Sequence, residues 1–299
     1  MHPTQQAASR RDFLKAATLA AMGTSFAAKA AAAEATPPRK LFSAMGIAAS
    51  LDRAAALKAL GAEFLTEGVG GFLVPDQPAE AFAKNLAKLA AAPLPVLACN
   101  GFIRPANLRC VGADANPDKV LAWAEVAFRR LQQVGGKFIV FGSAGARALR
   151  AGWTKEQADI QFIALLKRMG PLAQQHDIIV AVEQLQASEC NYLNRIGETA
   201  AVLRAAGHPH IRLLADLYHM ARMGDTPADL KAAMDVVVHV EIAEKEERTV
   251  PGVHGDDFRP FFRVLREAGY QGTISIEGKG TNPQIGAAFQ EIARQAAEV

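Results

Sequence analysis

The stretch IIVAVEQ (residues 178–184) is a run of mostly aliphatic residues that ends in a carboxylate, Glu183, and an amide. An apolar run without polar alternation is typical of a parallel strand that is buried on both faces. Segments with helical periodicity lie on either side, at 154–175 and 196–206, and the first opens with a capping box at Thr154. The sequence therefore predicts a β-strand between two helices that cover it.

The same strand and helix unit recurs eight times between residue 40 and residue 299. The predicted strands are 41–47, 63–69, 95–101, 137–142, 178–184, 211–216, 236–242 and 272–277. The predicted helices lie near 51–61, 78–91, 117–134, 154–175, 196–206, 226–234, 256–268 and 282–297. Eight units predict an α/β fold, a single closed (β/α)₈ TIM barrel over 40–299. An open doubly wound sheet more often has five or six strands and a glycine-rich phosphate turn, which this chain lacks after its first strand.

The first 33 residues have the pattern of an export signal. Arg10 and Arg11 precede a weakly apolar, alanine-rich run over 16–28, and small residues follow. This segment (1–33) resembles a twin-arginine signal peptide with its cleavage region, and 34–39 would then be a linker. The resemblance implies the twin-arginine export machinery as a partner, export of the folded protein and a periplasmic location. The alternative is an amphipathic first helix.

Removal of this segment changes the charge of the chain. The sequence has 33 basic and 30 acidic residues, and the first 30 residues hold four of the bases and one of the acids, which leaves 29 of each. A neutral chain lacks the basic surface of a nucleic-acid-binding protein, so we expect a small neutral substrate and no nucleic acid. Outside the N-terminal run no apolar stretch reaches the length of a membrane span, so we expect no stable membrane insertion after cleavage.

The three cysteines contain no CxxC pair, which argues against a zinc knuckle or a disulfide framework. Cys110 and Cys190 could pair in an oxidising compartment if their loops meet. Separate, inert thiols are the favoured interpretation.

Carboxylates stand at the ends of the last four predicted strands. In a TIM barrel the carboxyl ends of the strands converge on one pocket. Four acids there would repel one another unless a cation held them together. Carboxylates with imidazole suit one divalent metal ion, Mn²⁺, Mg²⁺ or Co²⁺, with Zn²⁺ as a further option. The acids are Glu183, Asp216, Glu241 and Glu277, and His239 shares the strand face of Glu241.

The order of motifs along the chain resembles the xylose isomerase-like TIM barrel superfamily, whose sugar isomerases and epimerases include tagatose epimerases and hydroxypyruvate isomerase. The resemblance spans essentially the whole sequence after the signal segment. The motifs are VEQL (182–185), DLYH (216–219), HVEIAE (239–244), TVPG (249–252), and GYQG (269–272) leading to SIE (275–277).

This resemblance implies a metal site formed by Glu183, Asp216, Glu241 and Glu277. The match departs from the family at Glu241, where many relatives have His and hydroxypyruvate isomerases have Gln. A carboxylate is a competent ligand, so we favour Glu241. His239, two residues earlier, is the alternative ligand or a substrate contact.

The resemblance also assigns substrate-binding residues. His219 falls on the substrate-binding His of the D-x-x-H motif, and Glu189 on an acid that follows the first ligand. Arg248 aligns with a substrate-contacting Arg only after a one-residue insertion. The alternative for Arg248 is a solvated cation in the charged run 244–248.

In such enzymes the metal binds a substrate carbonyl and the neighbouring hydroxyl and stabilises an enediolate, while one carboxylate removes a proton and another returns it. By resemblance this pair is Glu183 and Glu277. Sugar phosphates are scarce outside the cytoplasm, and the chain has no glycine-rich phosphate cradle. We therefore expect a sugar isomerase or epimerase that acts on a non-phosphorylated sugar or keto-sugar.

Two alternatives remain open. One is an exported, metal-dependent lyase or epimerase of 3-keto-glycosides, and the other is a sugar-binding barrel without catalysis. The faces of the third and fourth helices could support a homodimer. Four polar residues near strand ends could contact substrate or be ordinary loop residues: Glu67, Asn100, Ser143 and Lys279.

Overall fold

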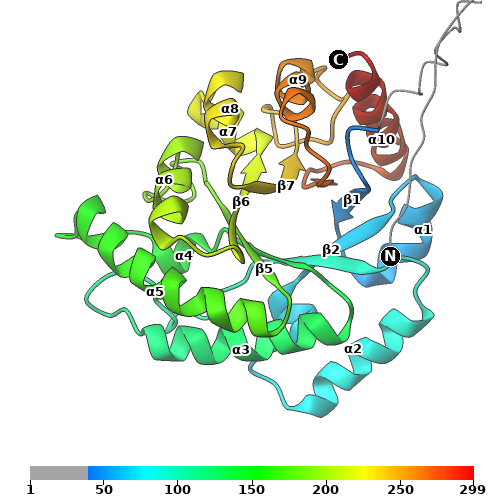
Figure 1. Cartoon of the computed structure of the whole chain (residues 1–299). Coiled ribbons are helices and arrows are strands. Elements are labelled where there is room, and N and C mark those ends of the chain that lie inside the picture. Colours follow the sequence, from blue (N-terminus) through cyan, green and yellow to red (C-terminus); the bar gives the residue numbers. More distant parts are fainter. Residues whose placement is uncertain (1–39) are drawn as a thin grey trace, which may run out of the picture. The chain divides into compact units, whose positions relative to one another are not determined.

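The computed structural model describes residues 40–299. The expected signal peptide and linker lie outside these residues. Eight parallel strands form a closed barrel in chain order, with β1 paired to β8 (Figure 1). The prediction of a single (β/α)₈ barrel is confirmed. The strands are β1 (Met45–Ala48), β2 (Phe64–Gly68), β3 (Val96–Asn100), β4 (Phe138–Phe141), β5 (Ile179–Glu183), β6 (Ile211–Asp216), β7 (Val237–Ile242) and β8 (Thr273–Ile276).

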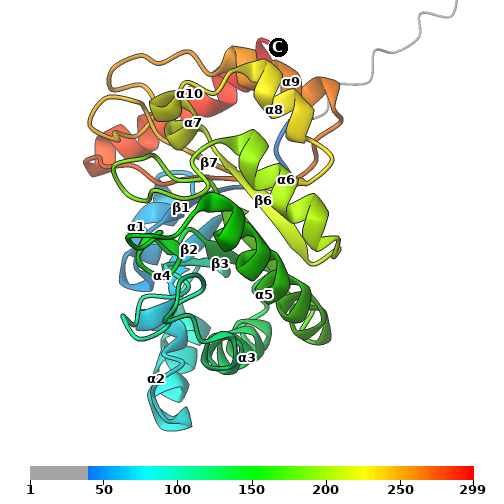
Figure 2. The same ribbon diagram turned by 90° about the vertical axis from the view of Figure 1, so that its left-hand side faces the viewer.

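Helices surround the strands on the outside of the barrel (Figures 1 and 2). None of the helices within 40–299 is both long and apolar enough to cross a membrane. They are η1 (Leu51–Arg53), α1 (Ala54–Ala59), η2 (Val69–Leu73), α2 (Ala79–Ala91), α3 (Pro117–Gln133), α4 (Ala144–Arg147), α5 (Lys155–Gln175), α6 (Ile196–Ala206), α7 (Leu217–Met223), α8 (Pro227–Ala233), α9 (Arg259–Glu267) and α10 (Asn282–Ala297).

The first strand begins later than the sequence predicts, at Met45 instead of residue 41. Phe42 is buried, and its ring packs edge-on against Phe262 at 5.2 Å and Tyr270 at 6.3 Å between ring centres. Residues 41 and 42 are therefore apolar because they pack at the amino-terminal end of the barrel, where Phe42 meets other aromatic rings. An apolar sequence pattern does not distinguish such packing from pairing in the sheet.

Three short helical segments were not predicted: η2, α4 and α7. Two of them, η2 and α7, follow a strand directly, and two residues separate α4 from the end of β4, so the sequence pattern indicates strand or loop there. The most consequential is α7, which begins immediately after Asp216 because that side chain caps the helix by accepting hydrogen bonds from two backbone N–H groups. Asp216, a predicted metal ligand, therefore also ends β6 and caps α7.

The core has an outer and an inner part. The outer part fills the space between strands and helices. Inside the barrel lies a small cluster that packs with Phe138 and Val238 and consists of Ala98, Val140, Ala181 and Leu214. The three cysteines are buried and free, which agrees with the favoured interpretation. This apolar cluster fills the barrel toward the amino-terminal ends of the strands. The space left for polar side chains is at the carboxyl ends.

Gly46→Ala is expected to destabilise the barrel by about 1–3 kcal/mol. A Cβ atom at Gly46 would lie 2.2 Å from the buried ring of Phe64 on the neighbouring strand. Gly197→Ala is the control, because Gly197 lies in α6 and a Cβ atom there would meet nothing within 4 Å, so alanine is expected to be neutral or stabilising. Urea unfolding of both variants checks this; equal stability of the two would contradict the packing argument.

Candidate metal and active site

Four carboxylates converge at the carboxyl ends of the last four strands. Each offers one oxygen, and these oxygens all lie within 4.8 Å of one another. Asp216 and Glu241 are direct partners in the β6–β7 register, so they stand at the same level of the barrel. We call this group the acid cluster, and its members are Glu183, Asp216, Glu241 and Glu277. Three are buried, and the side chain of Glu277 is 24% exposed.

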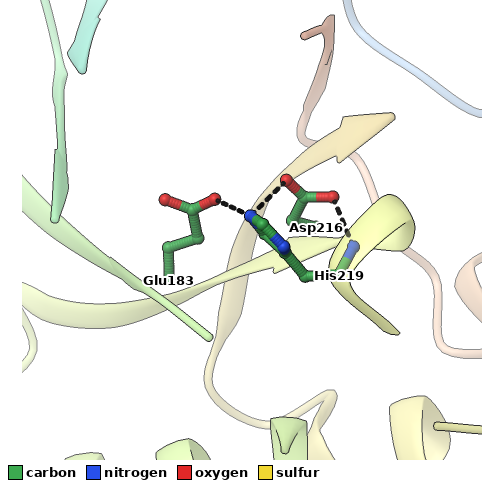
Figure 3. Close-up of side chains that lie close together, drawn as sticks. All are labelled: Glu183, Asp216 and His219. Atoms are coloured by element: carbon green, nitrogen blue, oxygen red, sulfur yellow. Dashed lines mark hydrogen bonds and ion pairs between the residues drawn. The ribbon is translucent and has the colours of Figure 1, made fainter. Parts of the chain in front are cut away.

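His219 is brought to the acid cluster by the cap of α7. One oxygen of Asp216 accepts hydrogen bonds from the backbone N–H groups of Tyr218 (2.7 Å) and His219 (3.1 Å). The turn that results directs the imidazole back, with Nε2 3.2 Å from Glu183 and 3.6 Å from Asp216 (Figure 3). The backbone N–H of Gln186 donates to Nδ1 at 3.2 Å, so in the neutral ring the proton is on Nε2, facing the acids.

The charges around His219 set its protonation. Burial lowers the pKa of the imidazole, but Asp216 and Glu183 outweigh it and raise the pKa to about 9 when the carboxylates carry no metal. Whether the ring is neutral or protonated, Nε2 carries a proton that faces the carboxylates of Glu183 and Asp216.

Arg248 reaches the acid cluster from the loop after β7. Its guanidinium forms an ion pair with Glu277, lies 3.6 Å from Asp216 and 3.5 Å from Glu189, and stands 4.7 Å above the centre of the Tyr218 ring. Its Nε donates to the backbone carbonyl of Glu277 at 3.1 Å. The side chain is 23% exposed. The structure thus places Arg248 and Glu189 at the rim of the site, and Arg248 is not a solvated loop cation.

Burial and mutual repulsion raise the pKa of three carboxylates of the acid cluster. Burial raises the pKa of Glu241 well above its usual value, and Glu277 and Glu183 raise it further. Burial and the Glu183 charge raise the pKa of Glu277 to about 7 against the opposite effect of Arg248. Burial also raises the pKa of Glu183, although His219 opposes this.

These carboxylates fit a divalent cation. Within 40–299, neither carboxylate oxygen of Glu241 has a hydrogen-bond partner, although both are buried. Buried oxygens without donors are costly unless a cation or a proton satisfies them. Four oxygen ligands at one point are a suitable set for Mn²⁺, Mg²⁺ or Co²⁺, and Zn²⁺ also accepts carboxylates.

The structure places His239 below the acid cluster and not within it. It precedes Glu241 by two residues, which on a strand displaces it by about 6–7 Å toward the other end of the barrel. Its Nδ1 lies 2.7 Å from the Thr273 hydroxyl, and its ring stacks on Phe138 with 5.2 Å between centres. Burial lowers its pKa to about 4, so the ring is neutral. His239 belongs to the floor of the barrel.

A cavity of about 430 Å³ opens beside Glu277 and Arg248. Three of the four residues that could contact substrate line it, namely Glu67, Asn100 and Lys279. Asn100 donates a hydrogen bond to Glu277 at 2.8 Å. Ser143, the fourth, instead accepts a hydrogen bond from the backbone N–H of Ile103 at 2.9 Å.

Two residues that support Glu183 escaped the sequence analysis. Arg147 is fully buried, and one of its terminal nitrogens donates to the backbone carbonyl of Glu183 at 2.6 Å. Gly142 leaves room for the carboxylate, since a Cβ atom there would lie 2.4 Å from Glu183 Oε2. Both stand in the segment after β4, where the sequence contains no periodicity or motif that could have signalled them.

Gly142→Ala is expected to lower about 10- to 100-fold any activity that depends on the position of Glu183, with the fold retained, because the added methyl group displaces the Glu183 carboxylate. Gly145→Ala is the matched control in the same segment, since a Cβ atom at Gly145 meets nothing within 4 Å. Solvent deuterium exchange into a substrate checks both variants. Equal activity of the two would show that the position of Glu183 tolerates the methyl group.

Comparison with known proteins identifies the class of the chain. The model of the xylose isomerase-like TIM barrel family matches residues 51–298, and the chain belongs to this family. Hydroxypyruvate isomerase of Escherichia coli is 24% identical over 132 residues, which are 43% of this chain and 51% of that protein. The chain spans about half the length, or less, of the curated relatives it matches.

Two solved structures share the fold. The 3-keto-D-glucoside 4-epimerase of Escherichia coli has a TM-score of 0.68 at 22% identity and covers 84% of this chain and 98% of its own. The IolI protein, solved with a zinc atom, has a TM-score of 0.67 at 15% identity and covers 85% of this chain and 98% of its own. At these identities the likeness is one of fold.

Proposed function

We propose that the protein is a divalent-metal-dependent sugar isomerase or epimerase that moves a proton at the carbon beside a carbonyl. The observation that carries this proposal is the acid cluster with the unpartnered oxygens of Glu241. The isomerase and epimerase names of proteins similar to this chain support the reaction class. The substrate is a non-phosphorylated sugar or keto-sugar, a choice that rests on the expected export of the chain.

The metal would be held by Glu183, Asp216, Glu241 and Glu277. When bound, it would polarise the carbonyl of a sugar that chelates it and so make the neighbouring C–H acidic. The zinc atom in the IolI structure supports metal binding by this fold, and the carboxylate donors also suit Mn²⁺, Mg²⁺ and Co²⁺.

The chain's own residues would move the proton. Glu183 extends from β5 and Glu277 from the end of β8, so the two carboxylates approach the acid cluster from different strands. One would take the proton and the other would return it. The Nε2–H of His219 would donate a hydrogen bond to a substrate oxygen, and Arg248 with Glu189 would hold the substrate at the rim.

Metal analysis of the folded protein, paired with deuterium exchange from D₂O into a panel of keto-sugars, tests this proposal. We expect stoichiometric metal and exchange that a chelator abolishes. Absence of metal, without rescue by Mn²⁺, Mg²⁺, Co²⁺ or Zn²⁺, would refute it. Chelator-sensitive sugar binding with no deuterium incorporation would instead indicate a sugar-binding barrel.

A second candidate is a lyase or epimerase of 3-keto-glycosides. The cavity of about 430 Å³ beside Glu277 favours it, because polar side chains line space next to the acid cluster that could accept a second ring. The fold shared with a 3-keto-D-glucoside 4-epimerase also supports it. Incubation with a 3-keto-glycoside separates the reactions, since a lyase releases the aglycone and an epimerase does not.

A further inference from the structure

Glu244 is a buried carboxylate outside the acid cluster. It follows Glu241 by three residues, and its side chain is fully buried. Its two oxygens accept five hydrogen bonds from the loop that carries Arg248. The donors are the backbone N–H groups of Gly252 (2.8 Å), His254 (2.6 Å), Gly255 (2.9 Å) and Asp256 (3.2 Å), and the hydroxyl of Thr249 (2.9 Å).

The loop over residues 245–257, which we call the arm, is thus wrapped around one anion. The backbone N–H of Glu244 also donates to the carbonyl of Thr249 at 2.8 Å, which closes the base of the arm. Burial raises the pKa of Glu244, but the hydrogen bonds from His254 and Gly252 prevail and hold it below its usual value. The Glu244 carboxylate is therefore ionised throughout the neutral pH range. A glutamine in its place would turn an NH₂ group, which is itself a donor, toward some of the N–H groups that Glu244 accepts from.

The other side of the arm is docked on the segment after β8. Lys279 N–H donates to the carbonyl of Arg248 at 2.8 Å, and Val250 N–H donates to the carbonyl of Lys279 at 3.0 Å. The two backbones are so close that a Cβ atom at Gly278 would lie 2.9 Å from backbone atoms of Thr249. The arm is held from two directions, and its position is fixed relative to Glu277.

Between these two anchors the backbone takes an unfavourable course. Glu247 and Arg248 have φ angles of 56° and 55°, in the left-handed region that residues other than glycine seldom adopt. Such conformations persist only when surrounding contacts enforce them. They turn the side chain of Arg248 toward Glu277, Asp216 and Glu189.

We propose that Glu244 is a positioning residue, which holds Arg248 against the acid cluster by templating the arm. This inference rests on the proposed function, because it assumes that the acid cluster binds the metal. It implies a coupling that can be measured. The single positive charge of the guanidinium lies against two of the metal-binding carboxylates, Glu277 and Asp216, so a loosened arm gives the cation a more negative site.

The experiment is calorimetric titration with Mn²⁺ alone of the wild type, Glu244→Gln, Arg248→Met and the double variant. We expect Arg248→Met to tighten Mn²⁺ binding about tenfold or more, because it removes a positive charge from the ligands. Glu244→Gln should shift the affinity in the same direction, and the double variant should bind no more tightly than Arg248→Met. Glu246→Gln is the control, since the side chain of Glu246 lies in the same arm but is 71% exposed.

Additive effects of the two substitutions would overturn the proposal, because Glu244 would then act on the metal independently of Arg248. Thr249→Val replaces Glu244→Gln in this test if Glu244→Gln fails to fold. It removes only one donor to Glu244, so it should loosen the arm less and shift the Mn²⁺ affinity in the same direction by a smaller factor.

Trypsin digestion supplies a readout without metal. The arm contains Lys245 and Arg248, and cleavage after them should be at least about tenfold faster in Glu244→Gln than in the wild type, because the released arm opens more often. Unchanged cleavage would overturn the role of Glu244. Failure of the wild type to bind Mn²⁺ would refute the proposed function, and the digestion would still decide whether Glu244 holds the arm.

Discussion

Glu183→Gln is expected to reduce deuterium exchange into substrate by about 10³-fold or more while most of the metal is retained. The amide keeps an oxygen that can ligate a cation, but unlike a carboxylate it cannot act as a base that takes up a proton. The packing should also survive, because Gln has the shape of Glu and the Arg147 contact is made to the backbone of residue 183. Exchange rate and metal content, measured on the same preparation, check the prediction.

Glu63→Gln is the matched control. Glu63 precedes β2 at the opposite end of the barrel, where its carboxylate accepts a hydrogen bond from the backbone N–H of Met45. This variant should keep both activity and metal. Equal losses of metal and exchange in Glu183→Gln would contradict the catalytic assignment and reduce Glu183 to a structural ligand.

Removal of the metal is expected to destabilise the protein more as the pH rises. In the metal-free acid cluster the pKa of Glu277 is about 7 and that of Glu241 is raised well above 4.5. In the unfolded chain both lie near 4.3. Between these values the folded state binds more protons than the unfolded state, so its stability falls with rising pH. The raised pKa values of these two carboxylates make the loss on the order of a few kcal/mol between pH 4.5 and 7.5.

Thermal or urea unfolding at pH 5 and at pH 7.5, with metal and with chelator, measures this effect. The stabilisation by metal should be small at pH 5 and large at pH 7.5, because protons and the cation compete for the same oxygens. Glu241→Gln serves as the comparison, since it removes one of the like charges, and its chelated form should depend less on pH. A stabilisation by metal that does not change with pH would contradict the prediction.

The fold and the acid cluster could be predicted from sequence because both follow from position along the strands. Continuous apolar runs such as 178–182 identify buried parallel strands, and an acid at the end of each run lies at the mouth of a closed barrel. The placement of His219 followed from the family motif. The helix α7 that delivers it was missed, because its first turn overlaps the end of the strand.

The contacts made by loops could not be predicted in the same way. Arg248 lies in a run of charges that is equally compatible with a solvated loop. Its direction depends on the hydrogen bonds of its loop to Glu244 and Lys279 and on its own contacts with Glu277. The roles of Arg147 and Gly142 depend on the approach of neighbouring strands within a few ångströms. Such close approaches are properties of the packed chain and leave no periodic pattern in the sequence.

The strand order also determines when the site can exist during synthesis. All four acids come from β5–β8, and Glu277 follows the strand that closes the barrel by pairing with β1. A nascent chain that ends before Thr273 presents three of the four acids at most and leaves β1 without its second neighbour. Because one strand completes both the barrel and the acid cluster, a partly synthesised chain has no complete site in which to trap a metal ion.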